Sequence, residues 1–155
     1  MMTTEKIFLL YLCLTATACD PMYIIRRDRK QLTGTPESEC VVSAVASVSG
    51  VKNVRDLGKD DSACEGSVAN YIVYETTATG RERVQLYFCR KDTGEVEFVH
   101  NLGGIGLAYP KEKSDLVRST MVEVEKSIET KCKVSGLENG ISEQCIRVDC
   151  SNAAH

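Results

Sequence analysis

The chain has 155 residues, of which 43% are hydrophobic and 26% charged, and its formal net charge is −3. This size suits one globular domain with a real hydrophobic core. The slight negative charge, the absence of Trp and the 6% aromatic content give no indication of nucleic-acid binding.

The first 18 residues have the layout of a secretory signal peptide. An apolar run from Ile7 to Leu14 follows Lys6 and precedes the small residues Ala16-Thr17-Ala18. The run is too short to cross a membrane as a helix, and A-x-A is the usual pattern before a signal-peptidase site. We therefore expect cleavage before Cys19.

Residues Ala16-Thr17-Ala18-Cys19 also resemble the lipobox of bacterial lipoproteins, in which the cysteine thiol becomes a thioether to lipid. The family prefers Leu where this chain has Ala16, and the other three positions match. The resemblance implies a protein held on a membrane through lipid on Cys19.

The number of cysteines favours this lipid anchor over plain secretion. The chain has eight cysteines, and cleavage of the leader removes Cys13 and leaves an odd number. In an oxidising compartment an odd number leaves a free thiol or an intermolecular bridge. If lipid occupies Cys19, the remaining cysteines are even in number and can form three disulfides; they are Cys40, Cys64, Cys89, Cys132, Cys145 and Cys150.

Residues 19–34 are expected to form a lipid-anchored tether. They include the charge run Arg26-Arg27-Asp28-Arg29-Lys30, and such runs are usually solvated chain. Alternatively, these cations contact anionic headgroups, each contributing on the order of 1 kcal/mol. Asp20 directly after the lipid site resembles the inner-membrane retention signal of enteric lipoproteins, a rule that varies between bacterial groups, so the choice of membrane stays open.

Beyond the tether, the pattern predicts a helix and then two strands. Thr35-Pro36-Glu37 is a helix start, with a capping Thr, Pro at the first helical position and an acid near the positive end of the helix dipole. Val51 to Val54 and Val68 to Thr77 are rich in β-formers. Apolar residues at helical spacing precede the stop at Gly50: Val41, Ala44, Val45 and Val48.

A hairpin and a long helix follow. Arg83 to Cys89 and Glu95 to His100 alternate apolar and polar residues around the turn signal Lys91-Asp92-Thr93-Gly94. The apolar pattern from Pro110 to Cys132 predicts the longest helix of the chain. Its apolar stripe is Val117, Met121, Val124, Ile128 and Cys132, and its solvated side carries Glu123, Glu125, Lys126 and Glu129.

Cys145 to Cys150 alternates like a final strand. The expected fold is therefore α+β over residues 35–150, in the order α-β-β-β-β-α-β. An antiparallel sheet of about five strands would carry two helices on one face, and disulfides would stabilise the domain. Residues 151–155 are expected to be a disordered tail.

Periodicity favours one disulfide pairing over the other arrangements. Cys132 continues the apolar stripe of the long helix, and Cys150 shares a strand face with Ile146 and Val148. We therefore expect a Cys132–Cys150 bridge. Cys145, on the opposite strand face, would then pair with one of Cys40, Cys64 and Cys89.

Little in the sequence indicates catalysis, and no catalytic residue is expected. Acid–base chemistry near neutral pH usually uses histidine, and the chain has only His100 and His155. We expect His100 at the end of a strand before a flexible loop and His155 in the tail. An active site at His100 is the alternative, and it would need a pocket with acidic neighbours. Cys89 is more readily explained by a bridge than as a nucleophile.

No metal or other cofactor is expected. The first helix together with Gly50-Val51-Lys52-Asn53-Val54 resembles the helix-to-strand turn of heavy-metal-associated domains. Those domains bind metal through a Cys-x-x-Cys pair, whereas this chain has the single Cys40 at that place.

Two segments indicate binding. The glycine-rich Gly103–Gly106 stretch, continuing to Tyr109, is either a connection that needs positive φ or a loop that presents apolar side chains. The acidic side of the long helix is either a solvated face or a docking face; its acids are Glu112, Glu123, Glu125 and Glu129.

The resemblance and the composition together imply a lipid-anchored, disulfide-stabilised protein of the bacterial cell envelope. It would face the periplasm or the cell surface and bind an envelope protein there without catalysis. A secreted inhibitor or effector without the anchor is the alternative, because compact disulfide-rich domains suit that role. An envelope hydrolase with an unrecognised site is a third reading.

Overall fold

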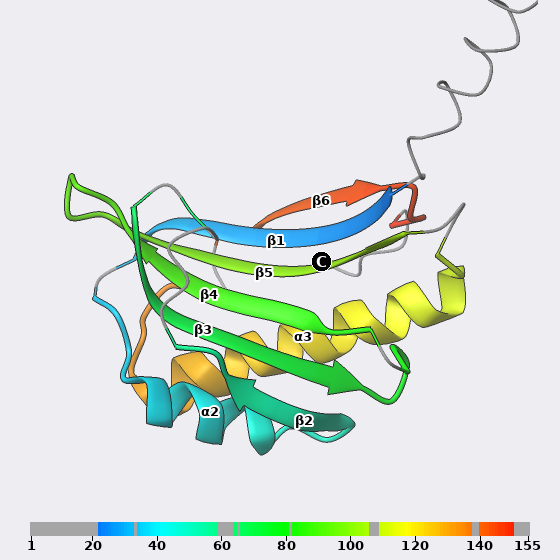
Figure 1. The fold of residues 1–155 in the computed structure, drawn as a ribbon, viewed down its shortest axis with the longest axis horizontal. Coiled ribbons are helices and arrows are strands. Elements are labelled where there is room, and N and C mark those ends of the chain that lie inside the picture. Colours follow the sequence, from blue (N-terminus) through cyan, green and yellow to red (C-terminus); the bar gives the residue numbers. More distant parts are fainter. Residues whose placement is uncertain are drawn as a thin grey trace, which may run out of the picture.

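The computed structural model describes residues 22–32, 34–58, 64, 66–80, 82–105, 109–137 and 140–150. Two helices lie against one face of a six-stranded antiparallel sheet, and no helix of the described residues covers the other face, which is called the open face below (Figure 1). The α+β class and the antiparallel sheet with two helices are confirmed, with one strand more than expected. The expected signal peptide over residues 1–18, Cys19 and the expected tail over residues 151–155 lie outside the described residues.

The strands are ordered β2-β3-β4-β5-β1-β6 across the sheet. In chain order the elements are β1 (Met22–Leu32), α2 (Ser38–Ala46), β2 (Val51–Asp56), β3 (Ser67–Thr76), β4 (Val84–Arg90), β5 (Val96–Ile105), α3 (Lys111–Cys132) and β6 (Ser142–Ile146).

The tether expected over residues 19–34 is wrong for residues 22–32, which form β1 between β5 and β6. Tyr23 and Ile25 of this strand are buried in the core. The arginine-rich run that follows indicated solvated chain, but Arg27 is half-buried and bonded to acids of α3 and β6. The density of charges within a short segment does not indicate ion-pair partners that are distant in the sequence.

The predicted hairpin is confirmed, with β4 and β5 paired from Val84–Leu102 to Arg90–Val96. Gly94 has a φ of +83°, as the turn requires. However, β5 continues past His100, so Gly103 and Gly104 belong to the strand and neither has a positive φ. A Cβ on Gly104 would overlap the Tyr23 side chain of the neighbouring strand, so this position needs glycine.

The two helices enclose one core with the sheet. Val41, Ala44 and Val45 of α2 are buried as expected, and so is most of the predicted stripe of α3. The expected capping role of Thr35 is wrong, because α2 begins at Ser38 with Glu37 at its N-cap position and no side-chain cap. Neither helix among the described residues has the length and apolarity needed to span a bilayer.

The last strand is shorter than predicted. β6 ends at Ile146, and Arg147 follows with a φ of 54°. This left-handed residue turns the chain back, so that Cys150 lies beside Cys145 instead of continuing the strand.

The six expected cysteines form three disulfides, but the preferred pairing is wrong. The bridges are Cys40–Cys132, Cys64–Cys89 and Cys145–Cys150. Cys132 points into the interior as its stripe predicted, but its partner lies in the first turn of α2. The turn after β6, which periodicity does not reveal, takes Cys150 to Cys145.

Candidate functional site

A row of polar side chains crosses the buried face of the sheet beneath α3. Tyr74 of β3, His100 of β5, Arg27 of β1 and Glu143 of β6 make up this row, and Arg27 lies directly opposite both His100 and Glu143 in the strand pairing. Because side chains on paired residues of neighbouring strands share a face, the topology aligns His100, Arg27 and Glu143. Tyr74 reaches His100 across the intervening strand β4.

The helix α3 completes this buried network with a carboxylate. Glu125 Oε1 lies 2.9 Å from His100 Nδ1, and the opposite ring nitrogen, Nε2, lies 2.5 Å from Tyr74 Oη. The expectation that Glu125 lies on the solvated side of the long helix is therefore wrong: the residue is only 1% exposed.

Arginines pair with the acids at the other end of the network. The Arg27 guanidinium donates to both carboxylate oxygens of Glu125, with Nε 2.9 Å from Oε1, and to Glu143 Oε2 at 2.5 Å. Arg118 of α3 donates through Nε to Glu143 Oε1 at 3.0 Å. Two cations thus face two carboxylates, so that the buried charges are balanced.

The hydrogen bonds fix the tautomer of His100. Burial lowers the pKa of His100 and outweighs the opposing effect of Glu125, so the ring is neutral. Burial alone would raise the pKa of Glu125, but hydrogen bonds from His100 and Arg27 lower it, so the carboxylate is ionised and can only accept. Nδ1–H therefore donates to Glu125, and Nε2 accepts from the Tyr74 hydroxyl.

The network is closed to substrates. His100 and Tyr74 have no exposed surface, and both ring nitrogens of His100 are engaged within the protein. The expectation of a strand-terminal His100 before a flexible loop is wrong, because the residue lies in the middle of β5. Its acidic neighbour is present, but the His100 side chain is fully buried and does not line the hollow described below.

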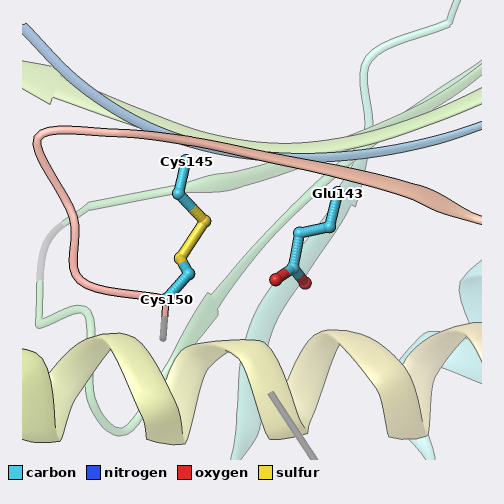
Figure 2. Close-up of side chains that lie close together, drawn as sticks. All are labelled: Glu143, Cys145 and Cys150. Carbon is cyan, nitrogen blue, oxygen red and sulfur yellow. A yellow bond between two sulfur atoms is a disulfide. The ribbon is translucent and has the colours of Figure 1, made fainter. Parts of the chain in front are cut away.

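A second group brings together Glu143, Cys145 and Cys150 next to α3 (Figure 2). Figure 2 shows the side chains of Glu143 and Cys145 pointing from β6 toward the helix. Both sulfur atoms are bonded to each other in the disulfide, and the Glu143 carboxylate is bonded to Arg27 and Arg118. A thiolate is the form of cysteine that binds metal, so the oxidised protein offers no metal site here.

The open face of the sheet carries a hollow of about 360 Å³ among the described residues. Its lining is Arg26, Lys30, Cys64, Tyr87, Cys89, Lys91, Glu97 and Val99. The Cys64–Cys89 bridge and Tyr87 form a small cluster with Val68 and Val99 on this face.

Three cations and one acid give this hollow a positive balance. Arg26 Nε lies 3.1 Å from Asp28 Oδ2 beside the hollow, and Lys91 Nζ lies 3.2 Å from Glu97 Oε2. Lys30, at the exposed end of β1, has no ion pair among the described residues. The sequence showed these charges as one run with no indication of the face that each residue occupies.

The other predicted binding features lie apart from this hollow. Glu112 and Glu123 of α3 are exposed, while Glu129 accepts a hydrogen bond from the Gly136 amide. At the glycine-rich segment, Ile105 is 72% exposed, whereas Tyr109 is buried with its ring 4.8 Å from that of Tyr23. Gly106 and Leu107 lie outside the described residues.

No known protein family, no curated protein and no solved structure matches this chain.

Proposed function

We propose that this chain is a lipid-anchored, disulfide-stabilised protein of the bacterial cell envelope that binds a partner and performs no catalysis of its own. The observation that carries the anchor is the cysteine pairing. Cys40, Cys64, Cys89, Cys132, Cys145 and Cys150 bond only to one another. Cys19 then has no cysteine left to pair with once the leader, which holds Cys13, is removed.

An unpaired thiol at the start of an exported chain is reactive toward other thiols and disulfides. Attachment of lipid through a thioether at Cys19 removes that reactivity. It also explains why the one unpaired cysteine that remains after removal of the leader stands directly after Ala16-Thr17-Ala18. The same pairing supports an oxidising compartment, because structural disulfides are rare in the cytosol.

The open face of the sheet supports a binding role. The two helices cover the opposite face, and the hollow gathers cations at Arg26, Lys30 and Lys91 over the buried ring of Tyr87. Such a surface favours a partner that presents an acidic group. The partner is therefore expected to be an envelope protein or peptide with an exposed carboxylate.

The position of His100 supports binding over hydrolysis. A general acid or base must come within hydrogen-bond reach of the proton that it transfers. His100 has no exposed surface and already bonds Tyr74 and Glu125, so its place in the fold is structural.

Mass spectrometry of the mature N-terminus from bacterial membranes tests the anchor. Diacylglycerol on Cys19, and its loss together with membrane association in Cys19→Ser, is the expected result. An unmodified N-terminus at Cys19 would favour the secreted inhibitor or effector instead.

A pull-down from envelope extract tests the binding face. Lys30→Glu with Lys91→Glu is expected to lose the partner, because both changes reverse charge at the hollow. Lys52→Glu on β2 serves as the matched control, since Lys52 is exposed and does not line the hollow. If the double variant and the control recover equal amounts of the partner, the hollow is not its binding site.

A further inference from the structure

Four apolar side chains gather on the open face of the sheet at the end where β1 begins. Met22 of β1 pairs with Ile105 of β5, and Ile24 of β1 pairs with Ile146 of β6. Met22 and Ile24 are two residues apart on one strand, so all four share a face. We call these four residues the apolar patch.

The apolar patch is exposed to an unusual degree. Ile105 is 72% exposed, Met22 56% and Ile146 42%. Gly103, opposite Ile24, adds no side chain that would cover its neighbours. The other exposed large apolar residues among those described are Leu57, after the far end of β2, and Leu116 and Val122 on α3. Contiguous exposed apolar residues mark interaction surfaces more often than isolated ones do.

The covalent chain fixes how far this patch can lie from Cys19. Only Asp20 and Pro21 separate Cys19 from Met22. Three residue steps reach about 10 Å at full extension. A lipid on Cys19 therefore holds the first residue of β1, and the patch with it, within about that distance of the headgroups.

We propose that the apolar patch of Met22, Ile24, Ile105 and Ile146 rests in the bilayer interface beside the lipid on Cys19, as a second point of membrane contact. This inference rests on the proposed lipid anchor. The two acyl chains of a diacylglyceryl group on Cys19 already anchor the chain stably, and a second contact adds to this anchor by mass action and limits how the domain can turn on the membrane.

Charge contributes little to this contact. Arg26 follows Ile24 on the same face of β1, and its Nε lies 3.1 Å from Asp28 Oδ2, so this cation is balanced by an acid of the protein itself. The exposed Arg147, directly after Ile146, then adds one cation beside the patch. Membrane contact through the patch is expected to depend on apolar side chains and to withstand added salt.

The contact sets the orientation of the binding hollow. Strands rise about 3.3 Å per residue, so Arg26 and Lys30 lie about 13 and 26 Å further along β1 than Met22. With β1 directed away from the bilayer, the hollow lies beyond the headgroups, where a protein partner can reach it. Figure 1 shows β1 running along the sheet between β5 and β6.

A single tryptophan provides the test, because the chain contains no Trp of its own. Ile105→Trp places the reporter at the most exposed residue of the patch, and Met22→Trp provides a second exposed position on the neighbouring strand. Leu57→Trp is the matched control, since Leu57 is 48% exposed and lies at the opposite end and edge of the sheet. The acylated protein is reconstituted into vesicles of phosphatidylethanolamine and phosphatidylglycerol.

The expected result is a blue shift of the emission of Ile105→Trp and Met22→Trp on vesicles, with loss of intensity when the acyl chains carry bromine. Added salt should not reverse either change, and Leu57→Trp should show neither. Patch reporters that stay water-exposed and unquenched on vesicle-bound protein would overturn the inference and leave the anchor standing.

Two other results would also overturn the membrane contact. A blue shift without vesicles that grows with protein concentration assigns the patch to a second copy of the chain. A blue shift in dilute protein without vesicles assigns it to another segment of the same chain. If no acyl chain is found on Cys19, the proposed function fails instead. The patch can then still be tested with a maleimide-headed lipid coupled to the Cys19 thiol, which holds the patch at the same distance from the headgroups.

Discussion

Glu125 of α3 and His100 of β5 meet in a part of the core that solvent does not reach, with 2.9 Å between Glu125 Oε1 and His100 Nδ1. Only one rotation of the helix about its axis places this carboxylate above that ring. Breaking a buried polar contact leaves unpaired polar groups and costs free energy, so other positions of the helix are disfavoured. The contact therefore specifies how α3 sits on the sheet.

Replacing Glu125 by Gln tests how much this contact contributes to the free energy of unfolding. The amide removes the negative charge that balances Arg27, which leaves a buried cation with one partner fewer. Breaking a buried ion pair on one side typically lowers the free energy of unfolding by about 3–5 kcal/mol. Urea unfolding measures the loss. Glu123→Gln, exposed on the same helix, should change stability by less than about 0.5 kcal/mol; similar losses in both variants would contradict the network.

Acidification should destabilise the protein below pH 6.5, the ordinary pKa of the histidine side chain. The pKa of His100 is lower than this when the protein is folded, so between the two values the unfolded chain binds a proton and the folded one does not. Stability is then present above pH 6.5 and falls with pH, by up to about 1.4 kcal/mol per pH unit.

The lowered pKa of Glu125 acts in the same direction at lower pH. Its stabilisation is present above the ordinary value of 4.5 and is lost as the pH falls toward the folded value. Thermal melts from pH 7.5 to 4 measure both effects. In His100→Gln, whose amide can still donate to Glu125 and accept from Tyr74, the slope near pH 6 should flatten. An unchanged slope would rule out His100 as its source.

The three disulfides should contribute unequally to stability. Their sequence separations are 92 residues for Cys40–Cys132, 25 for Cys64–Cys89 and 5 for Cys145–Cys150. If chain entropy dominates, these loops correspond to about 4–5, 3–4 and 2 kcal/mol. Paired Cys→Ser variants, melted under identical conditions, should follow this order. The largest loss from the pair at 145 and 150 would show that local packing outweighs loop entropy.

Removal of β1 should prevent folding. A version that starts at residue 31 lacks the strand between β5 and β6 and exposes Phe98 and the carboxylate of Glu125. A version that starts at Asp20 keeps the whole strand and should give dispersed amide signals by NMR. The shorter version should aggregate or give the collapsed spectrum of an unfolded chain. A well-folded shorter version would mean that β1 is dispensable.

The sequence predicts local elements well because their signals are local. The turn at Lys91-Asp92-Thr93-Gly94 and the stripe of α3 around Met121 depend on neighbours within one element. β1 was not predicted because its charged residues are typical of solvent-exposed chain, and the acids that pair with them in the folded protein are distant in the sequence. Arg27 is 98 residues from Glu125 and 116 from Glu143.

The buried network could not be predicted for the same reason. Residue type alone does not distinguish Glu125 from Glu123, yet one is buried and the other exposed. One signal was available: Glu125 lies four residues after Met121 and three before Ile128, both in the predicted apolar stripe, so helical spacing places it at the edge of that stripe. The predicted disulfide pairing was wrong because the chain turns back at Arg147, and no sequence signal indicates the left-handed conformation of this residue.

The strand order has a consequence for how the polypeptide matures. β1 is the first described element to leave the ribosome, yet its two partners in the sheet come from much later in the chain. Until β5 has emerged, β1 has no partner on either side, and one of its edges stays unpaired until β6 follows, so the strand is open to wrong associations. A holding chaperone that shields it until synthesis is finished would therefore raise the yield of native molecules.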